Sequence, residues 1–138
     1  MRRTASWMAV AAISLATATS AGCNDRISQC NSLISVINEE QGKHADLNGD
    51  NAESFRKLGD ALDETARRVG DVPIKDEKLK AFRADYKTIC EDFAKAAREA
   101  AAGGDDQKKH DEAVKAMQSI GPREDKLVND INAFCQGT

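Results

Sequence analysis

The four cysteines of this 138-residue chain, Cys23, Cys30, Cys90 and Cys135, are the residues with the most specific chemistry. No two of them form a CxxC pair, and no histidine stands near enough in sequence to complete a zinc or haem motif. Thiols at such wide spacing predict disulfides rather than metal ligands, provided that the protein reaches an oxidising compartment.

The segment from Asp46 to Asn51 has some of the oxygen ligands of a calcium-binding loop, because Asp46, Asn48 and Asp50 occupy its first, third and fifth positions. Asn51 replaces the glycine that the sharp turn of such a loop requires. Lys57 replaces the carboxylate that completes the coordination sphere. We therefore expect a turn and a helix cap here, and no metal site.

Other residue types that could support catalysis are not arranged to do so. Neither His44 nor His110 shares a helical face with several possible metal ligands, so we expect both to be solvated surface side chains. No Asp or Glu interrupts an apolar stripe deeply enough to indicate desolvation, and neither a serine nucleophile motif nor a phosphate-binding loop is present. The sequence thus predicts no catalytic, cofactor-binding or metal site, and a protein that is not an enzyme.

Residues 1–22 have the pattern of a secretory signal peptide. Two arginines precede an apolar stretch, residues 5–18, that is too short to span a bilayer, and small residues then lead to Cys23. The small residues followed by Cys23 resemble a bacterial lipobox, the site at which the lipoprotein signal peptidase cleaves. Ser20 stands where that motif usually carries leucine.

This resemblance implies a bacterial lipoprotein with a mature domain of residues 23–138. Cys23 would carry diacylglycerol on its sulfur and an acyl chain such as palmitate on its amine, so the membrane is an implied partner. Each buried methylene contributes about 0.8 kcal/mol, so several acyl chains anchor the protein firmly. The residues after the cysteine favour the periplasmic face of the outer membrane over the inner membrane. The alternative is cleavage after Ala18 or Ala21, which leaves a soluble periplasmic or secreted protein.

The charge of the chain excludes one class of partner. The two arginines of the leader are its only charged residues, so of the 20 basic and 23 acidic residues of the chain, 18 basic and all 23 acidic ones remain after residue 22. A mildly acidic domain with interspersed signs has no electrostatic basis for binding nucleic acid.

Apolar residues recur at helical spacing, three and four residues apart, in four segments of the mature chain. No segment alternates with a period of two, so the sequence predicts an all-α fold. The four stripes contain Ile27, Cys30, Ile34 and Ile37; Phe55, Leu58, Leu62, Thr65, Val69 and Val72; Leu79, Phe82, Tyr86, Ile89 and Phe93; and Ala113, Met117, Ile120, Leu127, Ile131 and Phe134.

Cap residues indicate where these helices begin and end. Asp50 with Glu53 predicts a capping box that opens the second helix. Asp76 is the expected cap of the third helix, which should stop at Gly103-Gly104, and Asp105 or Asp106 can open the fourth.

Four amphipathic helices with short connections predict an up-down-up-down antiparallel bundle. The last helix should be kinked, or broken into two nearly collinear helices, at Gly121-Pro122, because proline removes a backbone hydrogen bond. The alternative architecture is a three-helix coiled coil with a loosely attached first helix.

The bundle topology selects one disulfide, Cys30–Cys135. Cys30 lies roughly 7 Å along the first helix, at 1.5 Å per residue, and Cys135 is in the last turn of the fourth, at the same end of the bundle. Cys90 lies roughly 21 Å from that end, beyond the Cα separation of about 7 Å that a disulfide spans. With Cys23 lipidated, Cys90 is left as a free thiol, which we expect to be a small buried hydrophobe.

These features favour a small, non-enzymatic, lipid-anchored protein of the cell envelope that acts as a structural or interaction module with an unknown envelope protein. The alternative is a periplasmic small-ligand-binding or sensory domain, with a ligand beside the alanine-rich half of the third helix. An apolar pocket around Ala96, Ala97, Ala100 and Met117 would favour the alternative, and a filled seam would favour the interaction module.

Overall fold

The computed structural model describes residues 21–44, 46–47 and 51–137, and within the first helix the side chains from Asp25 onward. Residues 1–20 of the predicted signal peptide, the side chain of Cys23 and three residues of the calcium-like segment, 48–50, therefore lie outside the described residues. None of the described helices combines the length and the hydropathy that are needed to cross a bilayer.

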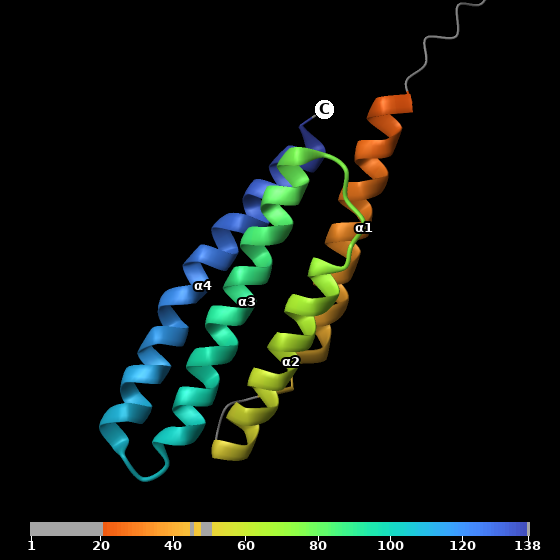
Figure 1. Cartoon of the computed structure of the whole chain (residues 1–138). Helices are drawn as coiled ribbons and strands as arrows, with labels where there is room; N and C mark the ends of the chain where they lie inside the picture. The colour runs from red at the N-terminus through yellow and green to blue at the C-terminus, as the bar shows by residue number, and fades with distance from the viewer. Residues whose placement is uncertain (1–20, 45, 48–50, 138) are drawn as a thin grey trace, which may run out of the picture.

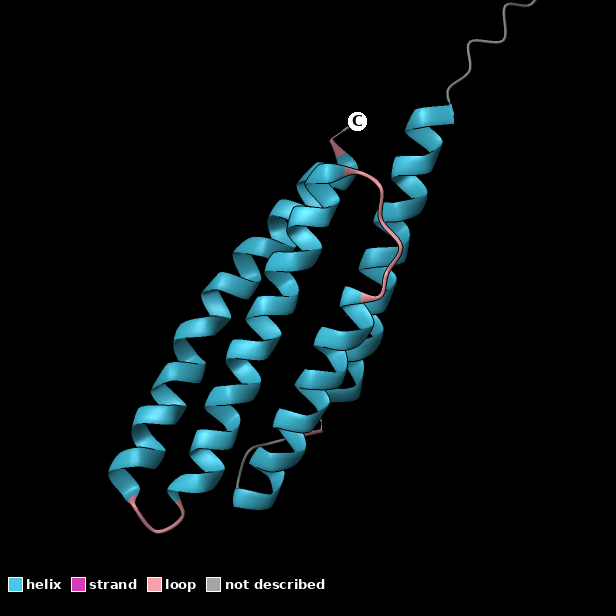
Figure 2. Ribbon diagram, viewed as in Figure 1, coloured by secondary structure: helices cyan, strands magenta, loops and turns pink. Residues whose placement is uncertain are grey.

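The described chain is all-α, as predicted, with short connections between its helices (Figure 2). The helices are α1 (Ala21–His44), α2 (Ala52–Gly70), α3 (Glu77–Gly103) and α4 (Gln107–Gln136). They run alternately down and up, which confirms the antiparallel bundle (Figure 1). The first helix begins at Ala21, two residues before Cys23 and before Ile27, the first residue of its predicted stripe.

Most helix ends lie at the predicted caps, with one correction. The side chain of Asp76 accepts hydrogen bonds from the backbone of Lys78 and Leu79, and Asp106 caps α4. The capping box of α2 is formed by Asn51 and Ser54, one residue later than the predicted pair. The Asn51 side chain accepts from the Ser54 backbone at 2.9 Å, while the Ser54 hydroxyl accepts from the Asn51 backbone at 3.2 Å.

The last helix is continuous through Pro122, so the alternative of two separate helices is wrong. Proline has no backbone N–H, and the carbonyl of Gln118 therefore lacks its helical partner. The exposed position of Pro122 leaves this carbonyl side of the helix accessible to water.

The four helices do not cover one another equally along the bundle. In Figure 1, α3 lies between α2 and α4 over most of its length, whereas α1 stops partway along α2. The hydrogen bond between His44, the last residue of α1, and Thr65 marks the level at which α1 ends. Beyond that level only α2, α3 and α4 continue.

The core is accordingly divided into two clusters. The disulfide half, which contains all the core residues of α1, is formed by Cys30, Leu33, Ile37, Ala66, Val69, Val72, Ile74, Leu79, Phe82, Tyr86, Ile89, Cys90, Ile120, Leu127 and Ile131. The alanine half is formed by Phe55, Ala96, Ala97, Ala100, Ala101, Ala113 and Met117, from the other three helices. The four-helix bundle is thus the correct architecture, and α1 completes it over part of its length.

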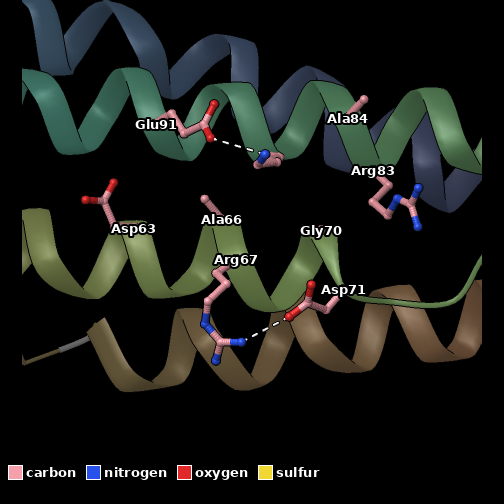
Figure 3. A pocket seen from close by; sticks show the side chains of 9 residues that line it. Asp63, Ala66, Arg67, Gly70, Asp71, Arg83, Ala84 and Glu91 are labelled. Carbon is pink, nitrogen blue, oxygen red and sulfur yellow. Dashed lines mark hydrogen bonds and ion pairs between the residues drawn. The ribbon is translucent and has the colours of Figure 1, made fainter.

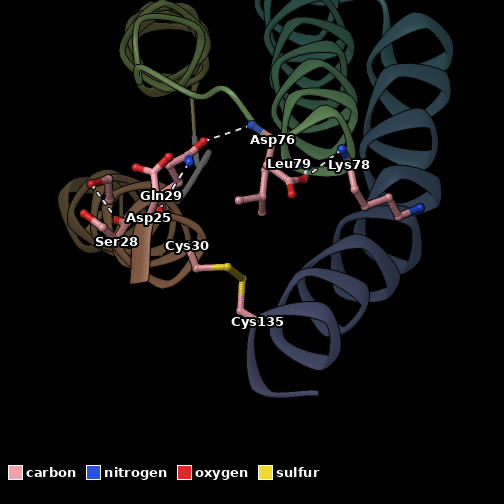
Figure 4. The surroundings of a disulfide bond; sticks show 9 residues. Asp25, Ser28, Gln29, Cys30, Asp76, Lys78, Leu79 and Cys135 are labelled. Atoms are coloured by element: carbon pink, nitrogen blue, oxygen red, sulfur yellow. Dashed lines mark hydrogen bonds between the residues drawn. A yellow bond between two sulfur atoms is a disulfide. The ribbon is translucent and has the colours of Figure 1, made fainter. Parts of the chain in front are cut away.

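The predicted disulfide joins α1 to α4 at one end of the bundle (Figure 4). The Cα atoms of Cys30 and Cys135 are 5.8 Å apart. Beside the bridge, the Gln29 side chain accepts hydrogen bonds from the backbone of Lys75 and Asp76, at 2.5 and 3.0 Å. These bonds hold the segment between α2 and α3 against α1. At this end of the bundle, both that segment and α4 are therefore connected to α1.

Candidate functional site

A half-open cavity of about 280 Å³ lies where the end of α1 meets the other three helices. Every helix contributes to its lining, and its walls are apolar on the sides that α2 and α3 provide. The lining residues are Gln41 and His44 of α1, Leu58, Leu62 and Thr65 of α2, Tyr86, Ile89, Cys90 and Phe93 of α3, and Glu124 of α4.

A hydrogen-bonded cluster of three side chains forms the polar end of this cavity. The Tyr86 hydroxyl donates to Glu124 Oε1 at 2.9 Å, and Gln41 Nε2 donates to the same oxygen at 2.9 Å. Gln41 Nε2 also lies 3.3 Å from the Tyr86 oxygen. Tyr86 is only 1% exposed, and burial, followed by the charge of Glu124, raises its pKa. The tyrosine therefore stays neutral and acts as a donor to the carboxylate.

Cys90 contributes a neutral thiol to the cavity wall. It is buried and free, and burial followed by the charge of Glu124 raises its pKa to about 12. Because the thiolate is the reactive form of cysteine, such a thiol is inert at neutral pH. The prediction of a small buried hydrophobe is confirmed.

His44 and Thr65 close the cavity at the level where α1 ends. The Thr65 hydroxyl donates its single hydrogen to the Ala61 carbonyl at 2.9 Å. It can then only accept from His44 Nε2, 3.1 Å away, so the histidine carries a hydrogen on Nε2. The prediction of a solvated surface histidine is wrong for His44, which is half-buried and bonded to α2.

Glu40, a buried acidic residue next to Gln41 of the cavity lining, connects α1 to α2. Glu40 is 1% exposed, and its carboxylate accepts from Lys43 at 2.7 Å and from Arg68 of α2. Arg68 also forms two hydrogen bonds to Glu39, of 2.8 and 3.2 Å. Glu40 contradicts the prediction that no acidic side chain is desolvated, and its bond to Arg68 connects α1 to α2.

A furrow of about 520 Å³ between α2 and α3 is lined mostly by charged side chains (Figure 3). Arg67 pairs with Asp71 at 3.0 Å, and Lys87 with Glu91 at 3.5 Å. Arg83 donates to the Val72 carbonyl at 2.6 Å. The last acidic group of the furrow, Asp63, pairs with Arg98 at 2.6 Å. Each carboxylate of this furrow thus pairs with an arginine or a lysine, while Arg83 bonds to a backbone carbonyl.

A groove of about 540 Å³ extends along the alanine half, on the side that α1 does not reach. Its walls include Phe55, Leu58, Phe93, Val114 and Met117. His110 lies in the same groove and packs edge-on against Phe55, with ring centroids 5.4 Å apart. His110 is therefore half-buried as well, which corrects the prediction that it is solvated.

Of the four residues beside which the sequence allowed a pocket, the three alanines are packed in the core, whereas Met117 lines the groove of the alanine half. Ala96, Ala97 and Ala100 are at most 4% exposed and belong to the core of the alanine half. Near them, a Cβ on Gly59 of α2 would lie 3.3 Å from the Ala94 carbonyl of α3, so these two helices approach closely. The small side chains thus serve helix packing, and the cavity lies nearer to the end of α1.

The structure places the predicted site residues as follows. Cys30 and Cys135 meet in the disulfide, and Cys90 lies in the cavity wall. Lipidation of Cys23 stays a prediction, because the side chain of Cys23 lies outside the described residues. Within the described chain, no group of three or more His, Cys, Asp or Glu side chains is arranged to hold a metal ion.

Sequence reasoning missed Glu40 and Glu124, although a periodic signal marks both. Glu40 follows Leu33 and Ile37 at helical spacing, and Glu124 falls between Ile120 and Leu127 on the stripe of α4. An acidic residue at a stripe position indicates a buried partner, here Arg68 for Glu40 and Tyr86 for Glu124.

Comparison with known proteins leaves the fold and these contacts as the basis for assigning a function. No protein-family model matches the chain, and no curated protein or solved structure is significantly similar to it.

Proposed function

We propose that this chain is a small, non-enzymatic lipoprotein of the bacterial envelope, anchored through Cys23, that acts as a structural or interaction module for another envelope protein. The anchor is inferred from the lipobox-like residues before Cys23, with the periplasmic face of the outer membrane as the favoured location. The close packing of Ala96, Ala97 and Ala100 in the alanine half favours an interaction module over a ligand pocket in that part of the bundle.

One structural observation carries this proposal: α1 is continuous from Ala21 through the disulfide-linked Cys30. Cys30 lies seven positions after Cys23 in this helix, which corresponds to roughly 10 Å along the axis. An anchor on Cys23 would therefore connect to the core through a rigid element and a covalent bridge. A lipid at this position would fix how the whole bundle stands on the membrane.

The groove of the alanine half supports an interaction role at the opposite end. α3 has 27 residues, so the bundle extends roughly 40 Å from the disulfide to the connection between α3 and α4. Because α1 ends near Thr65, no described helix packs on the groove beside Phe55 and Val114, which Leu47 of the connection between α1 and α2 also lines. An amphipathic helix of a partner would complete the four-helix arrangement there.

The anchor is tested by replacing Cys23 with alanine and fractionating the cells. We expect the wild-type chain in the membrane fraction, with a mass that includes the acyl chains, and the variant in the soluble fraction. Unchanged membrane association and an unmodified wild-type mass would contradict the proposal.

The interaction surface is tested by placing a photo-crosslinking amino acid at Val114, in the groove, and in a matched variant at Ala116. Ala116 is exposed and lies about 200° around the same helix, at 100° per residue. We expect a discrete protein adduct in intact cells from Val114 alone, and its loss when Cys23 is alanine. Equal adducts from both positions would contradict a specific groove.

A further inference from the structure

We propose that the cavity at the end of α1, between Tyr86 and Glu124, binds a small protonated amine that carries an apolar group. This site goes beyond the interaction role proposed above, and it depends neither on the anchor at Cys23 nor on the groove of the alanine half.

The size and the walls of the cavity define the apolar part of the ligand. Its volume of about 280 Å³ equals roughly nine water-sized groups at about 30 Å³ each. Leu58, Leu62, Ile89 and Phe93 provide the walls, and Ile89 is 6% exposed. A ring or a short branched chain would fill this space and remove these walls from water.

The polar end of the cavity defines the charged part. Tyr86 and Gln41 both donate to Oε1 of Glu124, and among the described residues no donor bonds to Oε2. The hydroxyl of Thr65 and the thiol of Cys90 are neutral, and His44, which also lines the cavity, has its Nε2 bonded to Thr65 at 3.1 Å. The arginine of α4, Arg123, pairs with Asp92 at 3.0 Å. The carboxylate of Glu124 is the acidic group of the cavity lining. No buried side-chain oxygen of the described chain lacks a partner, so Oε2 is accessible to water, which an ammonium group would replace with a charge-assisted hydrogen bond.

Access and rigidity fit a ligand site. The cavity is open on one side, where Gln41 is exposed at the surface of α1. Tyr86 is fixed by burial, and its hydroxyl orients the carboxylate before any ligand arrives. Such preorganisation lowers the cost of binding a small molecule.

The test compares three probes of similar shape with the full chain, its disulfide formed: benzylamine, benzyl alcohol and phenylacetate. Binding is followed by NMR chemical shifts of the Tyr86 and Ile89 signals. We expect benzylamine to bind at least about tenfold more tightly than benzyl alcohol, because a charge-assisted hydrogen bond adds to the same apolar contact. Phenylacetate should bind most weakly, since its carboxylate faces that of Glu124.

Two variants separate the charge from the cavity. Glu124→Gln keeps an acceptor for Tyr86 and Gln41 and should remove the preference for benzylamine over benzyl alcohol. Cys90→Leu fills part of the cavity and should weaken both probes, while circular dichroism confirms the helical fold of each variant. Equal affinity of the wild-type chain for benzylamine and benzyl alcohol, or shifts confined to other regions, would overturn the proposal.

Discussion

The disulfide half and the alanine half of this bundle solve the packing of the same helices in different ways. In the disulfide half, large side chains such as Leu33, Phe82 and Tyr86 keep the helices apart, and α1 closes the bundle. In the alanine half, small side chains such as Ala97 let three helices approach closely without a fourth. The side chains that α3 contributes are thus large where α1 is present and small where the described helices beside it are α2 and α4 alone.

The comparison also explains where the cavity lies. Leu58 and Phe93 contact the groove of the alanine half and line the cavity as well, so they mark the boundary between the two halves. At this boundary α1 ends, while α3 still carries the large side chains of Tyr86 and Ile89. Where the bundle changes from four helices to three, the side chains of the remaining helices do not fill the space beyond the end of α1. This space is the cavity, and Glu124 is the acidic residue that lines it.

The largest expected effect concerns the covalent link of the disulfide half. Replacing both Cys30 and Cys135 with alanine should lower the free energy of unfolding by about 4–5 kcal/mol, because the bridge closes a loop with a sequence separation of 105. Urea unfolding at neutral pH measures the loss. Cys90→Ala, which leaves the bridge intact, is the matched control and should cost about 1 kcal/mol. Equal losses in the two variants would mean that the bridge does not hold α1 in place.

A smaller effect tests the close approach in the alanine half. Ala97 is fully buried, so Ala97→Leu should push the helices apart and lower the free energy of unfolding by about 1–3 kcal/mol. Ala102 is exposed on the same helix, and Ala102→Leu should change stability by less than about 0.5 kcal/mol. If Ala97→Leu changed the free energy of unfolding as little as Ala102→Leu does, the helices around Ala97 would not be closely packed, and this description of the alanine half would be wrong.

The sequence was sufficient to predict the helices, the antiparallel order and the disulfide, because each follows from local periodicity and helix length. The bridge of Cys30 to Cys135 required only the rise per residue and the topology. The end of α1 relative to α2 was not predictable in this way, since nothing in the apolar pattern fixes how far one helix slides along another. The cavity depends on that offset.

The stripe of α1 shows the same limit at the level of single residues. The sequence suggested Ile27 and Ile34 as core positions, but Ile27 is 42% exposed and Leu33 is fully buried instead. The face of α1 is turned so that Glu40 points inward with Leu33 and Ile37. Arg68 makes this orientation possible by pairing with Glu40, and a pairing between two helices cannot be read from the period of either helix alone.

The smallest expected effect concerns a surface ion pair between α1 and α2, the contact that the alanine half does not have. Hydrogen bonds from Arg68 and then Lys43 lower the pKa of Glu39 from 4.5 to about 2. A carboxyl whose pKa is lower in the folded state stabilises the fold above its unfolded pKa, and this contribution is lost as the pH falls from about 4.5 to about 2. Glu39→Gln should therefore flatten the decline of unfolding free energy over this range in low salt. Glu77→Gln, an exposed glutamate paired only with Lys80 of its own helix, is the control. An identical acid slope in the wild-type chain and Glu39→Gln would show that the contact of α1 with α2 depends on Glu40 and the apolar core rather than on this surface pair.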